Sequence, residues 1–230
     1  MGIGGFTGWL RRGGENLPPR LRDRYADKLG RPAPNMKTPP IFFAHDPAEP
    51  LRPHRFAGND AQLDYFRHMK GIDENLGRLL DALDELALTQ NTVVVFTSDN
   101  GYFLGEHNCG DKRSLYEESL RIPMLVRYPP LFKPGGKVEE MILNVDLAPT
   151  FLDLAGLSVP ATMQGRSWKA LASGQGIDDW RTSFVAHYYK DLGPTPTCVA
   201  LRTETAKLVV VTGRFKMHHL WALQSAPLFV

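Results

Sequence analysis

Residues 92–123 read TVVVFTSDNGYFLGEHNCGDKRSLYEESLRIP, and the rest of the chain is best interpreted outward from them. Residues 92–96 are apolar and mostly β-branched, without polar alternation, which predicts a central strand of a parallel sheet that is covered on both faces. Residues 98–101 (SDNG) follow that strand at its carboxyl end, where open α/β sheets bind their ligands. Asp99 and Asn100 offer two hard oxygen donors that suit Ca²⁺ or Mg²⁺. Taken alone, Asp-Asn-Gly is more typical of a simple turn.

Polar and basic residues follow this pair closely in the sequence. His107, Lys112 and Arg113 could close around an anion that is held beside a metal ion. Cations next to a metal predict an anionic substrate. Arg113 is equally compatible with a structural ion pair to Glu117.

The order of short motifs in this stretch resembles the sulfatase family of the alkaline-phosphatase-like superfamily. The motifs are SDNG (98–101), GEH (105–107), GDKR (110–113), YEES (116–119) and RIP (121–123). They are most similar to the branch that acts on sulfated sugars and glycosaminoglycans. The resemblance implies an α/β fold, an alkaline-phosphatase-like three-layer sandwich with an incomplete N-terminal part and a small C-terminal antiparallel-sheet subdomain.

The same resemblance implies roles for individual residues. Asp99 and Asn100 correspond to ligands of a divalent metal, Ca²⁺ in the first place and Mg²⁺ as the alternative. Lys112 corresponds to the lysine that binds the sulfate. His107 would donate a hydrogen bond to the ester or to a sugar acid, although a loop histidine that holds the turn fits almost as well. The implied partner is a sulfated carbohydrate.

Three segments are expected along the chain. Residues 1–58 are rich in Pro and Gly and predict irregular structure, which the resemblance places over the mouth of the site. Residues 59–170 are expected to form the C-terminal half of the sulfatase core with its metal loop. They begin with an amphipathic helix from Asn59. Residues 171–230 are expected to form the small subdomain, with a divergent tail beyond Gly213.

Finer expectations concern the later parts of these segments. Residues 123–127 predict a second buried strand, and residues 141–150 predict a short strand that leads into a helix starting at Pro149. Asp146 is interpreted as a cap of that helix. In the subdomain, strands are expected at residues 183–189, 199–202 and 207–212.

The nucleophile of the family has no counterpart where it is expected. Sulfatases of this type use formylglycine, made from a cysteine or serine in a C/S-x-P/A-x-R motif near the N-terminus, and an early Asp-Asp pair completes the metal site. Neither occurs before residue 92. Cys198 to Arg202 satisfies the minimal pattern but follows the metal strand, so we interpret it as a coincidence. The sequence therefore predicts that this chain alone has little or no activity.

Composition limits the remaining alternatives. The chain has 230 residues, of which 43% are hydrophobic and 23% charged, which is typical of a soluble globular protein. A formal charge of +2 gives no reason to expect nucleic acid as a partner. No apolar run is long enough for a membrane span, and residues 1–12 do not resemble a signal peptide, although relatives in this family are often exported. Localisation and oligomeric state therefore stay open.

Two other functions remain compatible with the sequence. A phosphodiesterase or phosphonate hydrolase of the same superfamily would share the sheet and a similar metal pair. A pseudoenzyme or sugar-binding module would keep the fold without turnover.

Overall fold

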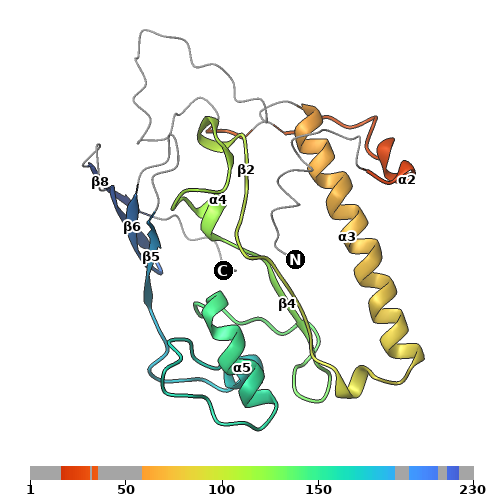
Figure 1. Ribbon diagram of the computed structural model, residues 1–230, viewed down its shortest axis with the longest axis vertical. Coiled ribbons are helices and arrows are strands. Elements are labelled where there is room, and N and C mark those ends of the chain that lie inside the picture. The colour runs from red at the N-terminus through yellow and green to blue at the C-terminus, as the bar shows by residue number, and fades with distance from the viewer. Residues whose placement is uncertain (1–16, 32, 36–58, 190–196, 212–216, 223–230) are drawn as a thin grey trace. The chain divides into compact units, whose positions relative to one another are not determined.

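The computed structural model describes residues 17–31, 33–35, 59–189, 197–211 and 217–222 (Figure 1). The chain divides into two compact units. The first unit contains residues up to Ala87 together with Tyr102–Arg113, and the second contains Leu88–Gly101 together with the chain from Ser114 onward. Each unit is described by itself.

The first unit is built on one long helix, drawn in orange and yellow in Figure 1. This helix, α3 (Asn59–Glu85), confirms the helix that the sequence predicts from Asn59. A short helix, α2 (Pro19–Arg22), contacts it. A Cβ atom on Gly71 would lie 3.0 Å from Cδ1 of Leu21, so this glycine allows close packing between two helices.

A small hairpin completes the first unit. Strand β2 (Phe103–Leu104) pairs antiparallel with β3 (Gly110–Asp111), and the 3₁₀ turn η4 (Glu106–Asn108) joins them. Phe103 is buried and anchors the hairpin. The predicted site residues His107 and Lys112 lie on this hairpin or directly after it.

The second unit begins with the 3₁₀ turn η3 (Thr89–Asn91) and strand β1 (Val94–Thr97). β1 pairs antiparallel with β4 (Met124–Arg127), with Val94 opposite Arg127. The expectation of a parallel strand covered on both faces is therefore wrong for the described residues. All four β1 residues are partly exposed, and Leu125 of β4 is 63% exposed. Within the described chain β4 is the one strand beside β1, which leaves apolar surface of both strands open.

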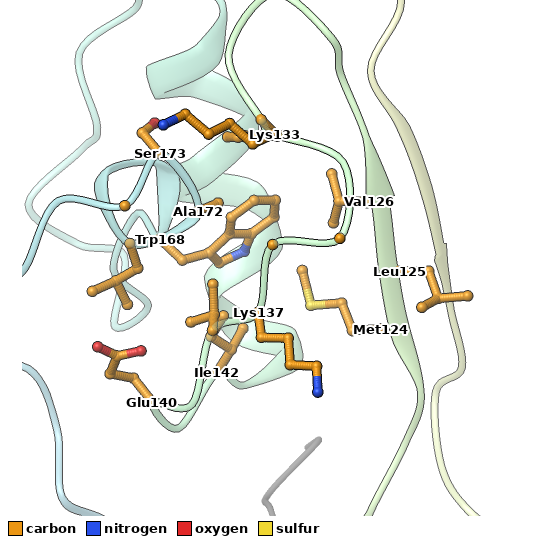
Figure 2. A pocket seen from close by; sticks show the side chains of 16 residues that line it. Met124, Leu125, Val126, Lys133, Lys137, Glu140, Ile142, Trp168, Ala172 and Ser173 are labelled. Carbon is orange, nitrogen blue, oxygen red and sulfur yellow. The ribbon is translucent and has the colours of Figure 1, made fainter.

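An aromatic core lies between β4 and the helices that follow it. These helices are α5 (Leu147–Leu154) and α6 (Lys169–Ala172), whereas α4 (Glu117–Leu120) precedes β4. The buried members of the core are Phe132, Ile142, Trp168, Leu171 and Trp180. A cavity of about 510 Å³ borders this core. Figure 2 shows the indole ring of Trp168 among its lining side chains, between Val126 and Ala172.

The segment before α5 differs from its prediction. In place of a short strand, it contains the 3₁₀ turn η5 (Asn144–Asp146). The cause is Asp146, whose Oδ2 accepts a hydrogen bond from the backbone N–H of Leu143 at 2.8 Å and so closes a turn. The side chain of Asp146 makes no capping bond to α5, so its predicted role as the cap of that helix is wrong.

Asp146 is instead the centre of a buried polar network. Its carboxylate is fully buried and accepts hydrogen bonds from the backbone N–H of Arg166 at 2.8 Å and from two guanidinium nitrogens of Arg181, one of them at 2.7 Å. A Cβ atom on Gly165 would lie 2.0 Å from the carbonyl oxygen of Val145, so only glycine permits this approach. Three separate segments are thus joined at one carboxylate.

Four antiparallel strands form the C-terminal sheet, drawn in blue in Figure 1. They are β5 (Ser183–Tyr188), β6 (Cys198–Thr203), β7 (Ala206–Val211) and β8 (Met217–Ala222), paired in chain order. The first three agree with the predicted strands to within a residue at each end. The fourth was not predicted and lies in the segment interpreted as a divergent tail. Cys198, Ala200, Val209 and Val211 pack with Leu115 in the core of this sheet.

Two buried cations of this sheet share one carboxylate. Arg202 and Lys207 are each 3% exposed, and Nζ of Lys207 lies 2.9 Å from Oε1 of Glu117, while Nε of Arg202 lies 3.3 Å from it. The pair predicted between Arg113 and Glu117 joins residues of different units and stays a prediction. Glu117 thus fixes α4 to the sheet.

This cluster predicts a dependence of stability on acid pH. Burial by itself would raise the pKa of Glu117, but Lys207 and Arg202 outweigh it and hold the pKa below the ordinary value of 4.5. Such a carboxylate stabilises the fold above its unfolded pKa, and the contribution is lost as pH falls through the folded value. Burial lowers the pKa of Lys207 from 10.5, which affects alkaline pH only.

Glu117→Gln is therefore expected to lower the free energy of unfolding at pH 7, and the difference from the wild type should narrow as the pH falls below about 4.5. Urea unfolding at a series of pH values measures this. Glu139→Gln, an exposed substitution of the same kind, should follow the wild type throughout. If the free energies of unfolding of the wild type and Glu117→Gln differed by the same amount at all pH values, the lowered pKa of Glu117 would be contradicted.

Candidate functional site

The Asp-Asn pair lies on a tight turn directly after β1. The hydroxyl of Ser98 donates to the carbonyl oxygen of Asn100 at 2.8 Å, and Nδ2 of Asn100 donates to the carbonyl oxygen of Gly101 at 2.7 Å. The side-chain oxygen of Asn100 is therefore the atom that remains to bind a cation. The second oxygen donor is the carboxylate of Asp99, which is an exposed residue. Both oxygens have the chemistry that Ca²⁺ or Mg²⁺ requires.

This turn is held in place by a later motif of the same series, YEES (116–119). The backbone N–H of Gly101 donates to the carbonyl oxygen of Ser119 at 2.8 Å. A Cβ atom on Gly101 would lie 2.1 Å from the carbonyl oxygen of Glu118, which no larger residue could avoid. The SDNG and YEES motifs thus touch, which gives a physical reason for their occurrence together.

His107 is placed by an unusual stretch of backbone in the first unit. Gly105, His107 and Asn108 have φ of 110°, 52° and 55°, in the left-handed region. Strain in non-glycine residues persists where surrounding contacts enforce it, and it is common at functional sites. Here the ring of His107 packs edge-on against Phe103, with centroids 6.3 Å apart. Its Nε2 lies 3.1 Å from Nδ2 of Asn35.

Lys112 follows strand β3 and is half-buried. Asp111, the residue before it, is paired in register with Phe103, so the end of the hairpin sets the position of Lys112. Asp99 and Asn100 belong to one unit and His107 and Lys112 to the other. Their convergence on one site therefore remains a prediction.

The donors present fit part of a metal site. Among the described residues, no three His, Cys, Asp or Glu side chains cluster as a metal-binding group. Ca²⁺ usually takes about six to eight oxygen ligands, so Asp99 and Asn100 would supply two of them. The contacts of Ser119 and Asn35 could not be predicted from sequence, because both residues lie far along the chain from their partners. The tight Asp-Asn-Gly turn was the one part of the candidate site that local sequence indicated.

Cys198 does not have the surroundings of a modified nucleophile. It is 3% exposed on β6, within the core of the C-terminal sheet. We therefore expect Cys198 to stay an unmodified cysteine after co-expression with a formylglycine-generating enzyme. Mass spectrometry of its peptide measures this, and a peptide carrying the aldehyde would contradict the interpretation.

Comparison with known proteins decides the family. The model of the sulfatase family matches residues 15–157, which include the turn at Asp99 and the hairpin that carries His107. The chain belongs to the sulfatase family. The model described as N-sulphoglucosamine sulphohydrolase, C-terminal, matches residues 105–229 of this sulfatase chain, including the segment beyond Gly213.

Named relatives of the sulfatase chain are themselves sulfatases, and one of them is named for the sulfate of an amino sugar. N-acetylglucosamine-6-O-sulfatase from Bacteroides thetaiotaomicron is 46% identical over 129 residues, which are 55% of this chain and 23% of that protein. An extracellular sulfatase SULF-1 homolog from Drosophila melanogaster is 34% identical over 157 residues, 66% of this chain and 14% of that protein. The sulfatase chain thus spans less than a quarter of either relative.

Solved structures agree with the sulfatase assignment. A structure in complex with its substrate D-glucosamine-2-N,6-O-disulfate is 38% identical with a TM-score of 0.69, over 71% of this chain and 34% of that one. A phosphonate monoester hydrolase from Silicibacter pomeroyi is 26% identical with a TM-score of 0.64, over 71% and 35%. The predicted α/β fold of the sulfatases is confirmed by these likenesses. No helix of the described residues is both long and apolar enough to cross a bilayer.

Proposed function

We propose that this chain supplies part of the active site of a sulfatase that hydrolyses a sulfate ester on a sugar. The observation that carries the proposal is the match of the sulfatase family over the segment that contains Asp99, Asn100, His107 and Lys112. Support for a sugar substrate comes from the relative named N-acetylglucosamine-6-O-sulfatase and from the neighbour solved with glucosamine disulfate.

Each of these residues has a role that follows from its chemistry. Asp99 and Asn100 would hold a divalent cation, Ca²⁺ by preference, which would supply positive charge next to the sulfuryl oxygens. Lys112 binds the sulfate as a compact positive charge. His107 donates an N–H to the ester or to a neighbouring acidic group, and its packing against Phe103 restricts its ring.

A chimera tests the proposal, because the chain spans 23% of the relative named N-acetylglucosamine-6-O-sulfatase. In that enzyme, the matching segment is replaced by the corresponding part of this chain, and sulfate release from glucosamine 6-sulfate is measured. We expect turnover by the chimera and none by the present chain alone. A folded chimera that releases no sulfate would contradict the proposal.

A second candidate activity is phosphonate monoester hydrolysis. The likeness to the enzyme from Silicibacter pomeroyi favours it, since its TM-score of 0.64 is close to that of the sulfatase neighbour. The same chimera, given matched aryl sulfate and aryl phosphonate esters, separates the two. We expect preference for the sulfate ester, and a higher kcat/KM on the phosphonate would favour the second candidate.

A further inference from the structure

A second cavity lies in the first unit, beside the hairpin that carries His107. Its volume is about 610 Å³, and it is bounded by the loop from Tyr25 to Arg31, by α3 and by the end of β2. Leu104 and Glu106 of the hairpin form part of its wall. The cavity is therefore built on the same hairpin as the proposed sulfate-binding residues.

Several contacts hold the walls of this cavity in place. Gln62 of α3 is 5% exposed and donates from Nε2 to the carbonyl oxygen of Leu104 at 3.3 Å. Nε of Arg67 donates to the carbonyl oxygen of Arg24 at 2.7 Å and so ties the loop to α3. Tyr25 has φ of 63°, in the left-handed region. The segment before the cavity loop is thus held on α3 through its backbone, which leaves the loop side chains available to a ligand.

The side chains around the cavity combine open apolar surface with positive charge. Phe66 is 49% exposed and Leu29 is 87% exposed. Arg31 is exposed, and its guanidinium has no hydrogen-bonded or ionic partner in the described part of the chain. Lys28 is also exposed and is paired with Asp27 at 2.7 Å. Burying exposed apolar side chains is favourable for any ligand that fits them.

This combination fits one class of ligand best. An aromatic ring offers a flat apolar surface to the C–H face of a sugar, and a guanidinium binds an oxyanion through two parallel N–H groups. Glu106 is acidic, but its Oε2 accepts a hydrogen bond from the backbone N–H of Leu104. An uncharged sugar would leave Arg31 without a partner, whereas a sulfated or carboxylated sugar would supply one.

We infer that this cavity is a subsite for a neighbouring anionic sugar of a sulfated oligosaccharide, with Phe66 as the stacking surface and Arg31 as the ligand of its sulfate or carboxylate. The inference rests on the proposed function. The hairpin that forms part of the wall also carries His107 and leads into Lys112, so the subsite and these two residues belong to the same unit. The protein therefore selects an oligosaccharide over a single sugar.

Binding of a heparin-derived tetrasaccharide to the 230-residue chain, measured by isothermal titration calorimetry, tests the subsite. Arg31→Ala and Phe66→Ala are each expected to weaken binding about tenfold, equivalent to about 1.4 kcal/mol. Two matched controls on α3, Arg78→Ala and Leu79→Ala, remove the same kinds of exposed side chain outside the cavity. They should bind as the wild type does.

The outcomes separate the subsite from the proposed function. In the chimera, Arg31→Ala should raise the KM for a sulfated tetrasaccharide more than the KM for the monosaccharide, because the subsite takes a different sugar. A chimera without turnover, combined with the expected binding losses, would reject the hydrolase and keep the subsite. No binding of the tetrasaccharide, equal binding of its desulfated form, or an equal loss in Arg78→Ala would overturn the subsite.

Discussion

Asp146→Ala is expected to lower the free energy of unfolding by about 3–5 kcal/mol, the range seen when one partner of a buried ion pair is removed. The wild-type carboxylate is fully buried and binds Arg181, which has only 13% of its side chain exposed. Without the carboxylate, this guanidinium loses its charged partner, and the N–H groups of Leu143 and Arg166 lose their acceptor. Urea unfolding followed by circular dichroism measures the loss.

Two further variants make that prediction specific. Arg181→Met combined with Asp146→Ala should regain part of the stability, because no unpaired charge stays buried. Asp179→Ala removes an exposed carboxylate that pairs with Arg166 and should leave the unfolding midpoint close to that of the wild type. An unchanged midpoint in Asp146→Ala would show that the network does not hold this unit together.

Lys112→Ala, made in the chimera, is expected to lower kcat by about 100- to 1000-fold, as the loss of one charge-stabilising donor does elsewhere. The reason is that a sulfuryl group gains negative charge on its oxygens as the ester bond breaks, and a fixed cation stabilises that charge. Rates of sulfate release at saturating substrate measure the effect. Lys112→Arg should recover part of the rate, since the charge is kept but its geometry changes.

Lys137→Ala is the matched control, because Lys137 is an exposed lysine of the second unit, outside the proposed site. It should leave kcat unchanged. If Lys112→Ala kept the full rate, or changed KM alone, Lys112 would have no role in stabilising the reacting sulfate.

Regular elements with a clear local period could be predicted from sequence. The apolar stripe from Leu63 onward gave α3 from its first residue, and the β-branched run near Lys207 gave β7. The exposure of β1 could not be predicted, because an apolar run shows what a strand can bury but not which neighbour covers it. Likewise, the turn at η5 depends on the bond from Leu143 to Asp146, a side-chain interaction that competes with strand geometry.

The candidate site likewise has one part that local sequence predicts and another part that depends on tertiary contacts. The turn at Asp99 follows from local sequence, since Asp, Asn and Gly favour such turns. Its support by Ser119 and the contact between His107 and Asn35 are tertiary pairings of distant residues, for which no periodic signal exists. Asn35 lay in a segment that the resemblance placed near the site mouth, which was the only available indication.

The proposed site of Asp99, Asn100 and Lys112 is tested directly by a crystal structure of the chimera. The crystal is soaked with Ca²⁺ and a sulfated glucosamine and examined by anomalous scattering. We predict a metal ion at about 2.3–2.6 Å from a carboxylate oxygen of Asp99 and from the side-chain oxygen of Asn100, the usual range for calcium. Nζ of Lys112 should lie within hydrogen-bonding distance of the sulfate. A metal bound elsewhere, with Lys112 facing away from the sulfate, would contradict the assignment of these residues to a sulfatase active site.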